Sequence, residues 1–287
     1  MSEKCFICWG EYKKILSGKD YMHHSSSKIY NIVKCINCWV EMVNPLPTKK
    51  EIMSWYPSDY YSYHVMLNKK PLKEVLMNIV KNILASKKFD IPREEWNWKY
   101  FLDVWCGDGF NLKTMQKKWW ESYGFEIGEK NKVWNIFYGP NISEIDFGTL
   151  KFDVIYLSHV MEHMEDPEWS FKKIYNLLKK WGKVILKTPN IDCISARYFW
   201  PYAVERDIPR HVVVHTKKSA TLLFKKCWFT ILKSKYLAQG TMYPWYLRRN
   251  EDQWKKSYWI MKIYFMLYRI YATIIWNTNQ MWFILTK

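Results

Sequence analysis

Short apolar runs, each bounded by charged or turn-forming residues, recur along the middle of the chain. Runs of this kind are typical of strands buried on both faces of a parallel sheet, and we expect strands within 101–104, 122–127, 151–163 and 182–190. Helix-like segments separate them, at 111–118 and from Asp166-Pro167 through Lys180, where the proline suits a first helical turn. The alternation of the two patterns predicts an α/β fold.

The first expected strand runs directly into a glycine-containing turn. Residues 101–109 read FLDVWCGDG, so Asp103 lies at the end of the apolar run, and Gly107 and Gly109 lie in the turn before the helix. A strand, a glycine turn and a helix in this order let the backbone approach a ligand closely at the carboxyl end of a parallel strand. We therefore expect a ligand site at this turn.

These residues resemble motif I of the class I S-adenosylmethionine (SAM) methyltransferases, whose usual string is LDVGCGxG. Further segments resemble that family in its own order: SYGFEI at 122–127, NISEIDF at 141–147, KFDVIYLSHVMEH at 151–163, GKVILKTPN at 182–190, and the segment 209–232. The resemblance implies a Rossmann-like seven-stranded SAM methyltransferase sheet. It also implies that residues 281–285 form the last strand of that sheet.

The same resemblance implies a set of cofactor-binding residues. Glu126 would accept hydrogen bonds from both ribose hydroxyls of SAM, and Asp146 would lie near the adenine amino group. The complete set is Asp103, Trp105, Cys106, Gly107, Gly109, Glu126, Ile127, Asp146, Phe147, Ser158 and His159. For Asp103 and Glu126, the alternative is a surface carboxylate near a helix N-terminus. The implied reaction is in-line transfer of the SAM methyl group to an oxygen, a nitrogen or a carbanion.

Histidines near the ends of two of these segments are the candidates for a general base. His159, Glu162 and His163 have the spacing that places side chains on one face of a helical turn. His163 and His211 are the predicted catalytic residues, because a histidine titrates near neutral pH; capping a helix or orienting a loop is the alternative role. Related quinone O-methyltransferases have Glu-x-x-Glu-His here, and His159 in place of the first Glu counts against a divalent metal.

Four of the seven cysteines form two CxxC pairs, Cys5 with Cys8 and Cys35 with Cys38. Two such pairs supply the four thiolates that a structural zinc ion prefers, and a site saturated by four cysteines has no open position for catalysis. His23 and His24 lie between the pairs and are alternative ligands, but we expect them to be solvated. The sequence therefore predicts a structural zinc ribbon.

The net charge of +17 suggests a nucleic-acid partner, but only seven of the 44 basic residues are Arg, the residue favoured for bidentate phosphate contacts. The lysines are scattered, so we expect no nucleic-acid partner. The N-terminus has no secretory signal, and no uncharged apolar run is long enough for a spanning helix, which favours a cytoplasmic protein. The apolar, aromatic segment 251–277 is expected to pack as a core helix or a lid, with peripheral membrane contact as the alternative.

We expect three parts: a zinc ribbon at 1–45, a helical linker or lid at 46–99, and a SAM-dependent methyltransferase domain at 100–287. Zinc ribbons precede SAM domains in a group of small-molecule methyltransferases that includes sugar C-methyltransferases. The resemblance implies a small-molecule acceptor, such as a nucleotide-sugar or a lipid-linked glycan. The alternatives are a quinone-type O-methyltransferase and a non-catalytic binding module with a zinc ribbon.

Tryptophan stands where the family pattern has glycine at seven positions: Trp9, Trp39, Trp105, Trp119, Trp181, Trp200 and Trp228. The chain has 18 Trp and only 10 Gly, whereas ordinary proteins have about 7% glycine, or about 20 in this length. We hypothesise that the source organism reads the codon UGA as glycine and that the gene was translated with UGA read as tryptophan. The alternative is a real, degenerate protein whose turns are strained by indoles.

Overall fold

The structure, a computed structural model, describes residues 4–21, 27–55, 99–107, 109–127, 135–237 and 278–287. Its larger part is a seven-stranded sheet with the strand order β10-β11-β8-β7-β4-β5-β6. Strands β6, β5, β4, β7 and β8 run parallel to one another, and β11 lies antiparallel between β8 and β10. The predicted seven-stranded Rossmann-like sheet is confirmed.

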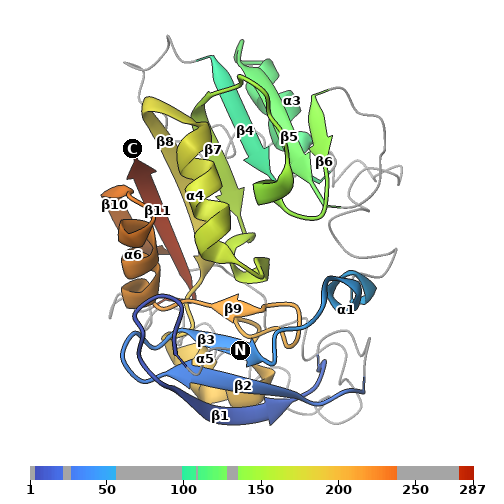
Figure 1. Ribbon diagram of the computed structural model, residues 1–287, viewed down its shortest axis with the longest axis vertical. Coiled ribbons are helices and arrows are strands. Elements are labelled where there is room, and N and C mark those ends of the chain that lie inside the picture. Colours follow the sequence, from blue (N-terminus) through green and yellow to red (C-terminus); the bar gives the residue numbers. More distant parts are fainter. Residues whose placement is uncertain (1–3, 22–26, 56–98, 108, 128–134, 238–277) are drawn as a thin grey trace, which may run out of the picture.

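The strands of this sheet are β4 (Tyr100–Val104), β5 (Glu121–Glu126), β6 (Ile136–Tyr138), β7 (Phe152–Ser158), β8 (Leu178–Pro189), β10 (Thr230–Leu237) and β11 (Gln280–Thr286). The helices between them are α3 (Phe110–Gln116), η2 (Ile142–Glu144), η3 (Met161–His163), α4 (Pro167–Leu177), α5 (Ile194–Phe199), η4 (Trp200–Tyr202) and α6 (Lys217–Lys226). In Figure 1, α4 lies across β7 and β8, and α6 lies beside β10 and β11.

The central strands are apolar throughout because both of their faces are buried. Along β7, Val154 and Tyr156 belong to the apolar cluster that contains Leu112 and Met115 of α3. The alternate residues Ile155 and Leu157 pack in the other cluster, with the side chains of α4. Side chains alternate between the faces of a strand, so the continuous apolar run predicted the position of β7.

Several element boundaries differ from the prediction: the helix expected to Lys118 ends at Gln116, and β7 ends at Ser158, before η3. The helix expected through Lys180 ends at Leu177, and β8 begins at Leu178. Beyond this point, the Nζ of Lys179 pairs with Asp153 Oδ2 at 2.7 Å, beside the first residues of β4 and β7. The register of β8 against β7 shifts near this point, so the start of β8 is irregular and has no strand-like sequence pattern.

A second sheet, of four strands in the order β1-β2-β3-β9, lies below the first in Figure 1. It contains β1 (Tyr12–Gly18), β2 (Tyr30–Cys35), β3 (Glu41–Asn44) and β9 (Val213–Val214). The short helix α1 (Lys49–Ser54) follows β3. Strand β9 comes from far along the chain and pairs antiparallel with β3, so the N-terminal sheet is completed by residues next to His211. The predicted domain boundaries at 45/46 and 99/100 stay predictions.

Several predictions fall outside the described residues. They concern His23 and His24, most of the linker 46–99, and the segment 251–277. Within the described residues, no helix has the length and apolar character needed to cross a membrane.

Candidate active site

The turn after β4 is held by backbone hydrogen bonds to the neighbouring strand β5. The N–H groups of Trp105 and Cys106 both donate to the carbonyl oxygen of Phe125, at 2.7 and 3.1 Å. Gly109 precedes α3 at a φ of 75°, in the left-handed region where glycine is unstrained. The predicted strand, turn and helix are therefore present, with the turn at the carboxyl end of β4.

Glu126 lies at the carboxyl end of β5, next to this turn. Its carboxylate accepts the N–H of Gly107 at 2.6 Å and the N–H of Ile127 at 3.0 Å. Burial raises the pKa of Glu126, and these two donors oppose the rise. Asp103 is buried at the end of β4, where its carboxylate accepts the side-chain amide of Asn111 at 2.9 Å. Both carboxylates are thus next to the turn rather than on the surface.

Two other predicted cofactor residues lie in the loop after β6. Asp146 accepts the N–H of Gly148 at 2.8 Å and so closes its own small turn. Phe147 is buried, and its ring lies 4.5 Å from that of Phe137 and 6.0 Å from that of Phe152. The aromatic contacts of Phe147 therefore anchor the loop to β6 and β7, and the side chain of Asp146 is exposed.

Ser158 ends β7, and His159 follows it at a φ of 59°, an uncommon conformation for a residue with a side chain. The His159 Nδ1 lies 3.1 Å from a Glu162 carboxylate oxygen, and its Nε2 lies 2.6 Å from the side-chain nitrogen of Gln280. A carboxylate accepts and an amide NH₂ donates, so this arrangement requires His159 to be protonated on Nδ1. His159 is therefore held between β11 and the buried Glu162.

Glu162 is completely buried in η3, yet it is ionised. Burial alone would raise the pKa of Glu162, but the hydrogen bond from His159 and the nearby imidazoles lower it to about 2. Its second oxygen accepts the hydroxyl of Thr188 at 3.0 Å. The carboxylate is thus a fixed negative charge among the site histidines.

His163 and His211 come together from η3 and from the loop before β9. Their rings are 4.8 Å apart, at 77°. The Nδ1 of His163 lies 3.0 Å from the Arg210 carbonyl, and the Nδ1 of His211 lies 2.7 Å from the Glu205 carbonyl. A carbonyl oxygen only accepts, so each Nδ1 carries a proton, and Nε2 is the ring nitrogen left to exchange a proton with an acceptor.

The two histidines differ in burial. Burial lowers the pKa of His163 to about 4, together with the nearby His211, although Glu162 opposes the shift. His163 is therefore neutral at physiological pH. His211 is only half-buried. One ligand atom from each of Glu162, His163 and His211 lies within 4.8 Å of the others, so the structure brings both predicted catalytic residues together around one carboxylate.

The side chain of Trp105 lies against this histidine pair. Its indole stacks on the His163 ring, with centroids 5.1 Å apart and an interplanar angle of 26°. The indole thus lies between the backbone of the turn after β4 and the His163 ring. The carboxylate of Glu126 is of the type that accepts two hydroxyl donors, whereas a large side chain at position 105 adds bulk directly beside the turn.

The loop that carries His211 is fixed by charges that the sequence analysis did not single out. The fully buried guanidinium of Arg210 contacts Asp20 Oδ1 at 2.8 Å and Asp207 Oδ1 at 2.6 Å. Burial alone would lower the pKa of Arg210, but the two carboxylates raise it. The scarcity of arginine, with two of the seven close together at 206 and 210, was the available signal.

The four cysteines of the two CxxC pairs converge, with their Sγ atoms all within 4.8 Å of one another. Cys5 and Cys38 are 3.6 Å apart, and Cys8 and Cys35 are 3.4 Å apart, with no disulfide among them. These separations are close to the roughly 3.8 Å edge of a tetrahedron with Zn–S bonds of about 2.3 Å. The donor set therefore fits a tetrahedral metal ion.

A family model described as a methyltransferase domain matches residues 71–234. The chain belongs to this methyltransferase family. The enzyme class predicted from FLDVWCGDG, a methyltransferase that uses SAM, is thereby confirmed. No curated protein matches the sequence of this methyltransferase.

Solved structures share the fold of this methyltransferase. The 1,6-didemethyltoxoflavin-N1-methyltransferase of Burkholderia thailandensis is 14% identical, over 92% of this chain and 98% of that chain, with a TM-score of 0.50. Phosphoethanolamine N-methyltransferase 2 of Haemonchus contortus, solved with SAM, is 13% identical, over 96% of this chain and 68% of that chain, with a TM-score of 0.50. At these identities the likeness shows the fold alone.

Proposed function

We propose that this methyltransferase transfers the methyl group of SAM to a small molecule or a glycan precursor, and that His211 is the general base. The observation that carries the proposal is the pair of imidazoles fixed beside the turn after β4. The sulfonium of bound SAM supplies a reactive methyl group. The residues of this chain then have to hold the acceptor in line and remove its proton.

His211 is the better base of the pair. A general base works best when its pKa lies near the working pH, and burial holds the pKa of His163 far below that range. His211 is half-buried, with Nδ1–H fixed on the Glu205 carbonyl and the lone pair on Nε2. The neutral His163 ring then orients the acceptor, and the Glu162 carboxylate stabilises the imidazolium that forms when His211 takes a proton.

The proposal includes a structural zinc ion at Cys5, Cys8, Cys35 and Cys38. Four thiolates would saturate the ion, so its role would be to hold the two knuckles together and not to catalyse. The contact between Cys5 and Cys38 lowers the pKa of Cys5 and raises the pKa of Cys38, so the two thiols share a proton that a bound metal ion would displace. The scattered lysines favour a small anionic acceptor over nucleic acid, and the composition favours the cytoplasm.

The test is methyl transfer from SAM by the chain with glycine at the seven positions, screened against nucleotide-sugars and quinol precursors. His211→Gln should lower kcat by about 10²–10⁴-fold with little change in SAM affinity, because it removes only the base. His163→Asn is the matched variant and should change KM as well as kcat. An unchanged kcat in His211→Gln would contradict the assignment of the base.

The cluster of Glu162, His163 and His211 also favours a second candidate, metal-assisted O-methyl transfer of the quinone type. These three side chains are of the types that bind divalent cations, and they lie close enough to share one. Loss of activity on mild chelation that leaves the four-cysteine zinc ion bound, restored by a divalent cation that accepts imidazole ligands such as Fe²⁺ or Ni²⁺, would favour this candidate. Activity that survives this chelation would favour a metal-free base.

A further inference from the structure

The seven tryptophans that stand at glycine positions of the family pattern all have positive φ. Their φ angles run from 46° at Trp200 to 68° at Trp181, overlapping the 55° to 75° of Gly107, Gly109 and Gly148. Among the described residues, ten non-glycine residues have positive φ, and seven of them are these tryptophans. The described tryptophans with ordinary φ are Trp55, Trp120, Trp169 and Trp282.

Two of the seven end a helix where glycine is the usual residue. After α6, the N–H of Trp228 donates to Lys225 O and that of Phe229 to Phe224 O. After α3, the N–H of Trp119 donates to Gln116 O and that of Trp120 to Met115 O. Both pairs form the Schellman motif, whose left-handed residue is normally glycine, and in both that residue is Trp.

Two more of the seven close the cysteine knuckles. Trp9 donates its N–H to Cys5 O at 2.8 Å, and Trp39 donates its N–H to Cys35 O at 3.0 Å. Both have φ near 60°, directly after the second cysteine of a pair. The turns are closed by the backbone of these residues, and the two indoles contact only lysine side chains on the surface, Lys226 over Trp9 at 5.9 Å and Lys218 over Trp39 at 4.7 Å, among the ring contacts described.

The side chains of these residues also lack the burial expected of tryptophan. Six of the seven, all except Trp105, are between 43% and 94% exposed. Of the tryptophans with ordinary φ, Trp55 and Trp282 are 2% and 6% exposed, whereas Trp169 is 61% exposed, so exposure alone does not separate the two groups and φ does. An indole ordinarily contributes by burying its large apolar surface.

Trp105 is the member of the set that lies in the site. Its indole stacks on His163 at 5.1 Å, beside the turn whose N–H groups face β5. With glycine at this position, the backbone of the turn could keep its conformation, and the indole that covers the His163 ring beside the turn would be absent.

We infer that the protein made in its own cell has glycine at positions 9, 39, 105, 119, 181, 200 and 228, and that glycine at position 105 opens the cofactor site. The first part stands on backbone conformation alone. The second part rests on the proposed function. If the cell reads the codon UGA as glycine and the translated sequence gives it as tryptophan, a single cause explains why the same residue, Trp, stands at all seven positions.

The first part is tested by tandem mass spectrometry of the protein purified from its source organism. Peptides spanning positions 119, 181 and 228 should carry glycine, and peptides spanning Trp55, Trp169 and Trp282 should carry tryptophan. The neighbouring Trp120 provides an internal control within one peptide. Tryptophan at the positive-φ positions would overturn the inference, whether or not the protein has any activity.

The second part is tested with two purified proteins that differ only at position 105. One carries all seven Trp→Gly substitutions, and the other carries six and keeps Trp105. Calorimetric titration with S-adenosylhomocysteine should show binding at least about tenfold tighter to the first, because it lacks the overpacked side chain. Equal affinities would overturn the role of position 105. Absence of binding in both would overturn that role and the proposed function together, while the mass spectra would still decide the first part.

Discussion

At the scale of single residues, the fold requires positive φ at positions that the sequence identified and at positions that it did not. The seven tryptophans were predictable because the family pattern has glycine there, and glycine marks a left-handed backbone. His159 and Asp207 also have positive φ, at 59° and 26°; these residue types are enriched at positive φ, but they are too common elsewhere for the sequence to mark these two positions. Both lie in the site, where packed surroundings hold strained residues in place. The local sequence pattern therefore predicts which turn residues have positive φ, whereas tertiary contacts determine the backbone conformation of the site residues.

The conformational cost at these positions is large in sum. A left-handed residue with a side chain costs roughly 1–2 kcal/mol, so seven cost several kcal/mol, comparable with the 5–15 kcal/mol stability of a whole protein. Trp119 is the simplest test, because it is 94% exposed and ends α3 in a Schellman motif. Trp119→Gly should stabilise the protein by about 1 kcal/mol, measured by urea unfolding.

Trp169 is the matched control for this change. It is also exposed, at 61%, but it lies inside α4 with ordinary φ. Trp169→Gly should destabilise the protein by roughly 0.5 kcal/mol, because glycine is a poor helix former. If both substitutions shift stability in the same direction, strain at position 119 is not the cause.

At the scale of elements, the N-terminal sheet holds the loop that carries His211. Strand β9 pairs with β3, and Glu41 of β3 forms a buried ion pair with Arg206 at 2.8 Å. The sequence predicted the seven-stranded sheet and a zinc ribbon but not this junction, because a two-residue strand has no periodicity to detect. The ion pairs were equally invisible, since they join residues more than 160 positions apart.

Asp20→Asn tests this coupling. The substitution removes one of the two carboxylates on the buried Arg210 and should cost about 3 kcal/mol of stability. Because the backbone carbonyl of Arg210 positions His163, kcat should also fall, with SAM affinity less affected. The two effects are measured by urea unfolding and by methyl-transfer kinetics.

Glu11→Gln is the control for the loss of a carboxylate in the same module. Glu11 pairs with Lys4 on the surface at 3.0 Å, with both side chains about half-exposed or more. Exposed pairs contribute little, so stability and kcat should not change measurably. An equal loss in both variants would show that the effect of Asp20→Asn is not specific to the loop.

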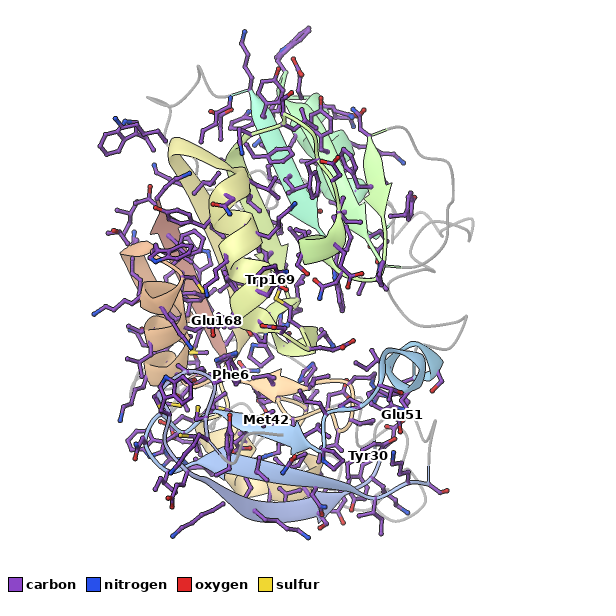
Figure 2. The ribbon with its side chains drawn as sticks, viewed as in Figure 1. Phe6, Tyr30, Met42, Glu51, Glu168 and Trp169 are labelled. Atoms are coloured by element: carbon purple, nitrogen blue, oxygen red, sulfur yellow. The ribbon has the colours of Figure 1, made fainter. Side chains whose placement is uncertain are left out.

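At the scale of the whole molecule, the two sheets are joined at a polar junction. The Nζ of Lys226 on α6 donates to the backbone carbonyl of Phe6 at 2.5 Å and pairs with Glu168 of α4 at 2.8 Å. Figure 2 shows Phe6 and Glu168 on the two sides of this junction. The first CxxC turn thus contacts the helices that pack on the larger sheet. We therefore expect the stability of the larger sheet to depend on an intact four-cysteine cluster.

Removal of zinc should therefore destabilise the whole protein and not only the two CxxC turns. A strong chelator should lower the thermal unfolding midpoint of the whole protein, and SAM affinity should fall with it, because metal binding is coupled to folding. Replacing Cys5 with serine should reproduce the shift, whereas Cys193→Ser, far from the four-cysteine cluster, should not change zinc content. Zinc content is measured by atomic emission. An unchanged midpoint after complete metal loss would exclude the structural role.

Stability should also fall as the pH drops below about 6.5, because of buried neutral histidines. Burial lowers the pKa of His163 to about 4 and that of His215 to about 3, whereas an unfolded histidine titrates near 6.5. Between these values the unfolded chain binds more protons, so the stability present above pH 6.5 is lost towards pH 4.5, by roughly 2–3 kcal/mol per histidine. The raised pKa values of Glu126 and Glu205 act in the opposite direction, so one histidine must be isolated by substitution.

His215→Asn should be less stable than the parent at pH 7.5, and the difference in free energy of unfolding should narrow as the pH falls to 4.5, measured by urea unfolding at each pH. A constant difference would show that His215 does not titrate on unfolding.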